Sequence, residues 1–216
     1  MHMTAATPSA QTAPPAPAAV PSSLTEDAFL GGKLKILQPE KGFRAGIDSV
    51  FLAATIPAKS GETLFEAGIG TGVAALCVAE RVSNIHITGV EIAQRYALMA
   101  EQNAKRNELE GNIRVIKGDV KDALRRDLAQ WPEHGSFSHA FANPPFFDDN
   151  KSTSSPNSLR AVANIFGPED LEVWVKVLAT MVALRGSVTF IHRAEALGRL
   201  LRSMEDRFGD IRVAPL

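Results

Sequence analysis

Between residues 63 and 192, short apolar segments alternate with longer segments of helical periodicity. The expected strands are residues 63–66, 85–91, 113–117, 139–143 and 187–192. The expected helices are residues 73–82, 93–107, 121–130, 170–183 and 195–207. Strands and helices that alternate at this spacing need crossover connections, which produce a parallel sheet with helices on both faces. The sequence therefore predicts an α/β doubly wound, mostly parallel sheet, whose ligands bind beyond the carboxyl ends of the strands.

The remaining residues divide the chain into three parts. Residues 1–23 are rich in Ala, Pro, Ser and Thr and contain no aromatic residue, which predicts a disordered tail. Residues 24–60 are expected to form an extension packed on the core, with a hairpin around Gly31-Gly32 and a helix over residues 48–56, for which Asp48 is a candidate cap. Residues 61–216 form the main domain.

Composition excludes several classes of protein. The 216 residues are 45% hydrophobic and 22% charged, as in an ordinary globular protein, and the net charge is −1. A surface that binds nucleic acid must therefore concentrate its Lys and Arg locally. No segment approaches the roughly 18–20 apolar residues that span a bilayer, and the start of the chain lacks the basic residues of a secretory signal. A cytoplasmic protein without a membrane partner is expected.

Cysteine and histidine usage argues against a metal site. The one cysteine, Cys77, lies among Ala, Leu and Val and is expected to be a small buried side chain of a helix. One cysteine forms neither an intramolecular disulfide nor a cysteine metal cluster, and the five histidines lack metal-ligand spacing. No metal is predicted.

The first candidate site is the loop from Glu66 to Gly72, which follows the first parallel strand. Glycines at 68, 70 and 72 permit unusual backbone angles and close approach of a ligand. The fingerprint of nucleotide dehydrogenases needs glycine at position 73, and Val73 breaks it. The Glu66 carboxylate suits a positively charged ligand, such as a sulfonium with an amino group, better than a pyrophosphate.

Two more acidic residues follow strands. Glu91, followed by Ile92, ends the second parallel strand and has the place of a carboxylate that accepts hydrogen bonds from ribose hydroxyls. Asp119, followed by Val120, ends the third and suits the amino group of an adenine ring. Asp119 is equally suited to cap a helix that begins at Val120, and both roles are compatible.

The fourth strand runs into Asn143-Pro144-Pro145-Phe146. Adjacent prolines fix the backbone and remove two N–H donors, so the exposed polar atoms are mainly acceptors: the Asn143 side-chain carbonyl and the Pro144 backbone carbonyl. Two acceptors on a rigid turn can hold both hydrogens of an –NH2 group and orient the nitrogen lone pair. Phe146 can stack on the planar group that carries the nitrogen.

The glycine loop and the acids at strand ends resemble those of class I (Rossmann-like) methyltransferases that use S-adenosylmethionine. The Asn143-Pro144-Pro145-Phe146 run resembles the N/D-P-P-Y/F/W motif of amino-methyltransferases. The resemblance implies in-line transfer of a methyl group from the sulfonium to a planar nitrogen, with positioning as the main contribution of the enzyme. It implies neither a metal nor a strong general base.

A longer resemblance covers roughly residues 24 to 213. The hairpin residues 24–37, the run from Gly42 to Leu52 and the motifs above are similar to the bacterial tRNA(Val) adenine-N6-methyltransferase family, whose members modify the adenine beside the anticodon. By this resemblance Arg44 and Asp48 lie near the cofactor pocket, and Asn143 belongs to both the cofactor and the catalytic sites.

RNA, with tRNA favoured, is the expected partner. Basic residues that could contact phosphates are Lys33, Lys35, Lys41, Arg44, Lys151 and Arg160. Three alternatives stay open: methylation of guanine N2 in ribosomal RNA, methylation of a glutamine amide in a protein, and a non-catalytic module that binds S-adenosylmethionine.

The carboxyl-terminal part departs from the family pattern. Methyltransferases of this class close their sheet with a final hairpin, whereas this chain ends at Leu216, just after an expected sixth strand at residues 211–213. Either the methyltransferase domain is truncated, or this edge of the sheet is built differently.

Overall fold

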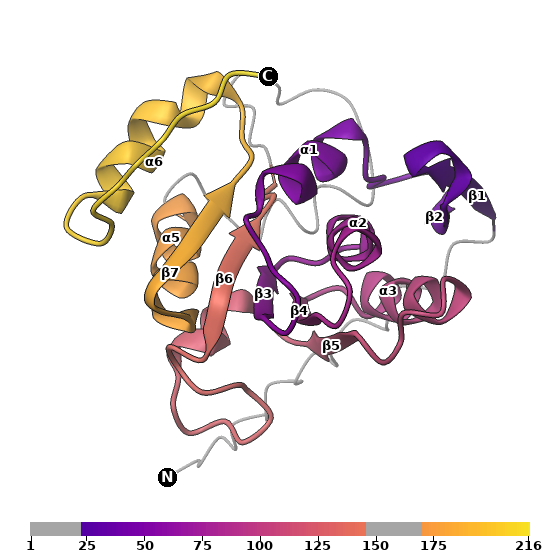
Figure 1. Cartoon of the computed structure of the whole chain (residues 1–216), viewed down its shortest axis with the longest axis horizontal. Coiled ribbons are helices and arrows are strands. Elements are labelled where there is room, and N and C mark those ends of the chain that lie inside the picture. The colour runs from indigo at the N-terminus through magenta and orange to yellow at the C-terminus, as the bar shows by residue number, and fades with distance from the viewer. Residues whose placement is uncertain (1–22, 146–169) are drawn as a thin grey trace, which may run out of the picture.

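The computed structural model describes residues 23–145 and 170–216 (Figure 1). The predicted tail up to residue 22, the side chain of Phe146 and the basic residues Lys151 and Arg160 lie outside the described residues. No helix within the described ranges is long and apolar enough to cross a membrane.

A five-stranded sheet forms the centre of the molecule, in the order β5-β4-β3-β6-β7. Its strands are β3 (Thr63–Ala67), β4 (His86–Glu91), β5 (Ile113–Lys117), β6 (Phe137–Ala142) and β7 (Val182–Phe190). All four neighbouring pairs are parallel. The chain adds β4 and β5 on one side of β3 and then crosses to the other side for β6. Such a reversal is where doubly wound sheets open a ligand crevice.

Helices cover both faces of this sheet (Figure 1). One face carries α1 (Ile47–Thr55), α2 (Val73–Arg81) and α3 (Gln94–Arg106), and the other carries α5 (Asp170–Met181) and the 3-10 helix η2 (Val120–Leu124). The helix α6 (Leu197–Met204), preceded by the 3-10 helix η3 (Ala194–Ala196), packs on α5. Separate buried clusters form on the two faces, because the helices that lie on the sheet turn their apolar stripes toward it.

The N-terminal hairpin consists of β1 (Leu24–Phe29), the 3-10 turn η1 (Leu30–Gly32) and β2 (Leu34–Pro39). Its strands pair antiparallel in a sheet of their own, and Leu34 and Ile36 enter the buried cluster of α1 and α2. Gly31 and Gly32 both have positive φ, at 68° and 90°, which explains why this turn needs glycine.

Asn103 of α3 and Asn107, the C-cap of this helix, complete the backbone hydrogen bonds of β2. Asn103 accepts from the Leu37 N–H at 2.7 Å and donates to its carbonyl at 3.0 Å. Asn107, one helical turn later, does the same with Lys35 at 2.8 and 2.9 Å. Each side-chain amide thus acts as a partner strand would and covers this edge of the hairpin. Asn103 also donates to the Thr71 carbonyl at 2.9 Å, so it joins the hairpin to the glycine loop.

Three predictions about elements are wrong. Residues 121–130 form only the short η2 and irregular chain, because the side chain of Asp119 caps a 3-10 turn that ends at Leu124. Residues 211–213 are not a strand, and β7 is the outermost strand described on that side. Asp48 does not cap α1: the cap is Gly46, and Asp48 lies inside the first turn. The other helices and strands agree with the predicted ranges to within a few residues, except that β7 begins five residues early.

Candidate active site

The carboxyl ends of β3 and β6 bring the two main motifs together. Ala67 pairs with Ala142, so Gly68 and Asn143 are the residues that immediately follow paired positions of neighbouring strands. Neighbouring strands lie about 4.8 Å apart. Asn143 therefore begins beside the glycine loop, at the crevice where the strand order reverses.

Each glycine of the loop has positive φ and a close neighbour. The angles are 70°, 58° and 87° at Gly68, Gly70 and Gly72. A Cβ on Gly68 would lie 2.7 Å from the Trp174 ring, and one on Gly70 would lie 3.1 Å from the Phe43 ring. Gly72 is the N-cap of α2 and packs against Ala100 of α3. Conformation and crowding both require glycine in this loop.

The Glu91 carboxylate is buried and holds the loop in place. One oxygen accepts from the Gly70 N–H at 3.0 Å, and the other accepts from the Ala93 N–H at 2.8 Å. Burial raises the pKa of Glu91, while the N–H donors of Ala93, Gly70 and Ile92 and the charge of Arg95 lower it. Each carboxylate oxygen can accept a further hydrogen bond, so the group can still serve a ligand.

Glu66 is the most deeply buried acid of the site, with 3% of its surface exposed. Its Oε2 atom and the Thr71 hydroxyl have no hydrogen-bond partner among the residues that the structure describes. Burial raises the pKa of Glu66 well above its ordinary value. A hydrogen bond from the Ala75 backbone lowers this pKa, and the charge of Glu91 raises it further. Unsatisfied buried polar atoms are costly, so they mark this loop as a place that suits a polar ligand.

Asn143 contacts a residue far away in the sequence. Its Nδ2 donates to Oδ2 of Asp48 at 2.7 Å, across a separation of 95 residues. Asp48 reaches it from the first turn of α1, where a negative charge is favoured by the helix dipole. Pro144 is buried, and Asn143 and Pro145 are partly buried.

The structure places Asp48 against Asn143 and Arg44 against the hairpin. The Arg44 guanidinium forms an ion pair with Asp27 and donates to the Thr25 hydroxyl and the Pro39 carbonyl, each at 2.7 Å. All three partners belong to the hairpin. Its predicted role in cofactor binding stays a prediction, and the contacts observed join the segment before α1 to β1 and β2.

The acid that follows β5 is placed as expected for a cap. Asp119 accepts from the Lys121 N–H at 2.9 Å and caps η2. Val120 is buried in the cluster beneath α5, and Ile92 packs against the same cluster. The capping role is confirmed, while a contact between Asp119 and an adenine ring stays a prediction.

Cys77 is buried within α2, as expected. Burial raises the pKa of its thiol to about 12, and the charge of Glu66 contributes. The thiol is therefore inert at neutral pH. Within the described residues, no group of His, Cys, Asp and Glu is arranged to hold a metal ion.

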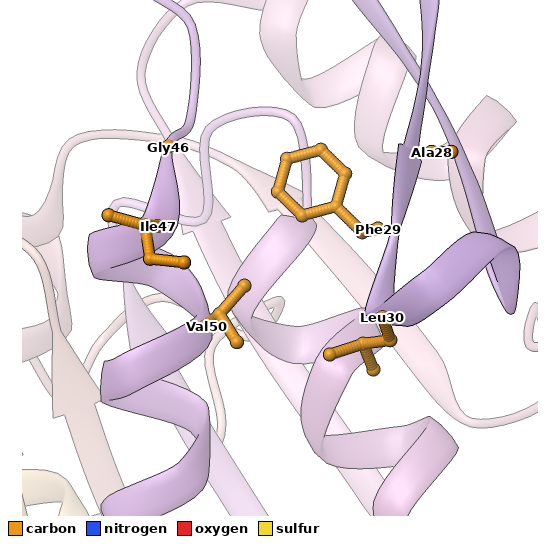
Figure 2. A pocket seen from close by; sticks show the side chains of 6 residues that line it. All are labelled: Ala28, Phe29, Leu30, Gly46, Ile47 and Val50. Atoms are coloured by element: carbon orange, nitrogen blue, oxygen red, sulfur yellow. The ribbon is translucent and has the colours of Figure 1, made fainter.

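An apolar pocket of about 390 Å³ opens between the hairpin and the first turns of α1. It is lined by Ala28, Phe29, Leu30, Gly46, Ile47 and Val50. Figure 2 shows the Phe29 ring and the Val50 side chain facing each other across it. Ile47 precedes Asp48 and is 67% exposed, so an apolar surface adjoins the Asp48–Asn143 contact.

Several residues that organise the site were missed by reasoning from the sequence. Gln38 is buried, accepts from the Ala45 N–H at 2.7 Å and donates to Asp27 at 2.8 Å. The Tyr96 hydroxyl accepts from the Phe43 N–H at 3.2 Å, and the Tyr96 ring meets the Phe43 ring edge-on. The Asn103 and Asn107 pair, spaced four apart at the end of the predicted helix 93–107, offered a weak signal, because amides at that spacing share one face of a helix.

Comparison with solved structures confirms the predicted fold. A predicted O-methyltransferase from Agrobacterium tumefaciens superposes with a TM-score of 0.59 at 21% identity, over 75% of this chain and 69% of that chain. An S-adenosylmethionine-dependent O-methyltransferase from Thermotoga maritima gives a TM-score of 0.56 at 15% identity, over 77% of this chain and 52% of that chain. At these identities the likeness concerns the Rossmann-like fold of class I methyltransferases.

Comparison of sequences gives the family. A tRNA1(Val) (adenine(37)-N6)-methyltransferase of Pedobacter heparinus is 28% identical over 77% of this chain and 67% of its own length. One from Erwinia tasmaniensis is 31% identical, over 64% and 54% respectively. This chain thus spans about two thirds or less of the length of these relatives. The Methyltransferase small domain family matches residues 44–164, more than half of the chain. The chain belongs to the Methyltransferase small domain family.

Proposed function

We propose that this chain is an S-adenosylmethionine-dependent methyltransferase that methylates the exocyclic N6 amino group of an adenine in tRNA, beside the anticodon, in the cytoplasm. The observation that carries the proposal is the position of Asn143, directly after the residue paired with Ala67 and hence beside Gly68. The names of the relatives from Pedobacter and Erwinia support the choice of adenine and of tRNA.

The residues at the carboxyl edge fit the cofactor. Bound S-adenosylmethionine supplies a methyl group on positively charged sulfur. Glu91 would hold the ribose hydroxyls, and Asp119 would accept from the adenine amino group. The Glu66 Oε2 and Thr71 Oγ1 atoms are buried and have no hydrogen-bond partner within residues 23–145 and 170–216, so they fit the charged and polar groups of the amino-acid portion. The glycines at 68, 70 and 72 allow the ligand to approach the backbone closely.

The substrate amine would be held by acceptors. Asn143 Oδ1 and the Pro144 carbonyl take one N–H each, which directs the nitrogen lone pair at the methyl group and opposes its delocalisation into the ring. Phe146 would stack on the base. Since the proton can leave after transfer, the work of this chain is to position the reactants.

The apolar pocket beside Ile47 supports a nucleobase substrate. The planar face of a base fits an aromatic ring and aliphatic side chains, and Phe29, Leu30 and Val50 offer these. Bases beside an anticodon are single-stranded, so extruding one costs little. Lys33, Lys35 and Lys41 are exposed on or just after the hairpin and would contact phosphates.

The proposal is tested by incubating the protein with methyl-labelled S-adenosylmethionine and total bacterial tRNA, followed by nucleoside analysis. We expect label in N6-methyladenosine. Label in N2-methylguanosine after incubation with ribosomal RNA, or in protein glutamine, would contradict the assignment and identify one of the rival substrates. Binding of S-adenosylmethionine without transfer to any of these would instead indicate a non-catalytic module.

A further inference from the structure

The contact between Asp48 and Asn143 has a consequence for the direction in which the amide of Asn143 points. A carboxylate has acceptor atoms only, whereas a side-chain amide has one donor end and one acceptor end. The atom of Asn143 that faces Asp48 Oδ2 at 2.7 Å is therefore the nitrogen. The amide is planar, so Oδ1 must point to the other side. Within residues 23–145 and 170–216, the structure records no hydrogen bond to Oδ1.

We propose that Asp48 is a positioning residue of the active site, whose carboxylate fixes the Asn143 amide so that Oδ1 faces the substrate –NH2 group. The inference rests on the proposed function, in which Oδ1 accepts from the amine. Rotation of the amide by 180° would present its –NH2 end to the substrate, and two donors would then face each other. Asp48 disfavours that state, because it would bring two acceptor oxygens together.

The surroundings of Asp48 explain how it holds a fixed place. It lies in the first turn of α1, whose N-cap is Gly46. A Cβ at Gly46 would lie 3.0 Å from Asp48 Oδ1, so the side chain occupies the space that this glycine leaves. The Gln38 side chain holds Ala45, which precedes Gly46: it accepts from the Ala45 N–H at 2.7 Å and donates to the Ala45 carbonyl at 3.4 Å. The hairpin thereby fixes the position at which α1 begins, and α1 in turn fixes the position of the Asp48 side chain.

Exchanging the carboxylate and the amide between positions 48 and 143 tests the proposal. Asn143→Asp alone places two carboxylates within hydrogen-bond distance, and we expect the single-turnover rate to fall about 100-fold or more. Asp48→Asn alone leaves an amide that can face Asn143 either way, and we expect a fall of about 3- to 10-fold. In the double variant Asp48→Asn/Asn143→Asp, residue 48 donates to one oxygen of residue 143 and leaves the other as acceptor. We expect the double variant to exceed Asn143→Asp by about 10- to 100-fold.

A structural role for Asp48 alone predicts different results. If the double variant is no faster than Asn143→Asp, or if Asp48→Asn changes KM or melting temperature but not the rate at saturating substrate, the proposal is overturned. Glu80→Gln is the matched control, because it removes an exposed carboxylate of α2 away from the site. We expect it to leave rate, cofactor affinity and melting temperature unchanged.

A second readout does not depend on catalysis. In 15N-labelled protein, the side-chain amide signals of Asn143 are identified by their loss in Asn143→Asp. We expect one amide proton to resonate downfield and to exchange slowly, and both features to disappear in Asp48→Ala. Unchanged signals in Asp48→Ala would refute the inference. If the wild-type protein transfers no methyl group to tRNA, the proposed function fails, while this measurement still decides whether Asp48 orients Asn143.

Discussion

The half of the site that we propose binds the cofactor (the cofactor half, residues 66–72 with Glu91) is mostly buried and is held through its backbone atoms. The half that we propose binds the substrate (the substrate half, residues 46–48 with Asn143) is partly exposed and is held through side chains. In the first, Glu91 binds backbone N–H groups of Gly70 and Ala93. In the second, one bond between side chains joins residues 95 positions apart.

Because of this difference, substitutions in the two halves should have different effects on stability and on catalysis. The glycine loop packs against Trp174, Phe43 and Ala100, so changes there disturb the fold together with cofactor binding. Asp48 and Asn143 lie at the rim, so changes there should alter catalysis while the fold survives. The variants below test whether effects on stability and effects on catalysis are divided between the two halves in this way.

Asn143→Ala should have the largest effect. It removes the proposed acceptor for the amine, and loss of one such hydrogen-bonding group typically costs about 10²- to 10³-fold in rate. We expect kcat to fall by that factor, while the dissociation constant of S-adenosylmethionine stays within about 3-fold and the melting temperature is retained. A variant with undiminished methyl transfer would show that Asn143 does not take part in catalysis.

Gly68→Ala should chiefly lower stability. Its Cβ would lie 2.7 Å from the Trp174 ring at a φ of 70°, so both crowding and a left-handed conformation oppose it. We expect a loss of about 2–4 kcal/mol, which lowers the melting temperature by about 5–15 °C.

Gly111→Ala is the matched control for that variant, because a Cβ there would meet no atom of the described residues within 4 Å. Its melting temperature, followed by circular dichroism, should remain that of the wild type. Equal melting temperatures for Gly68→Ala and the wild type would contradict the view that packing makes the loop rigid.

The two halves also differed in how well the sequence predicted them. The cofactor half is local: strand, glycines and helix follow one another within about ten residues, so their spacing alone indicated Glu66 through Gly72. Glu91 and Asn143 were found because parallel strands end at one edge of the sheet. The parallel sheet with helices on both faces followed from the same alternation. Two elements deviated: β7 begins five residues before the predicted strand, directly after α5, and irregular chain follows η2 where a helix was predicted.

The substrate half depends on contacts that no local pattern encodes. The bond between Asp48 and Asn143 joins α1 to the residue that follows β6, and Gln38 of β2 accepts from Ala45, which precedes α1. The sequence also did not predict the ion pair between Arg44 and Asp27 of the hairpin. Side chains from separate elements meet only after packing, which periodicity and propensity do not describe.

Glu66→Gln should change the melting temperature in a way that depends on pH, and it should also lower the affinity for the cofactor. Burial raises the pKa of Glu66 in the folded state, so the folded protein retains the proton to higher pH than the unfolded chain. The stability due to the protonated form is complete below the unfolded value of about 4.5 and is lost as pH rises through the folded value. The neutral amide avoids this loss.

We therefore expect Glu66→Gln to melt at nearly the wild-type temperature at pH 5 and above it at pH 8, as followed by differential scanning fluorimetry. Its affinity for S-adenosylmethionine should decrease, because Glu66 would face the positive charges of that ligand. A melting difference that is the same at both pH values would show that the carboxyl does not titrate in the folded state over this range.

Ile47→Asp should have the smallest effect. It tests whether the pocket beside the substrate half contacts the substrate. Ile47 is 67% exposed, so the change removes little packing, but it places a negative charge beside the pocket that would face RNA. We expect KM for tRNA to rise about 3- to 10-fold, with kcat and cofactor affinity unchanged. Leu184→Asp is the control, since Leu184 is 95% exposed near the start of β7, toward the opposite end of the sheet. Equal KM values for the two variants would mean that the effect is one of overall charge, and that the pocket between hairpin and α1 does not contact the substrate.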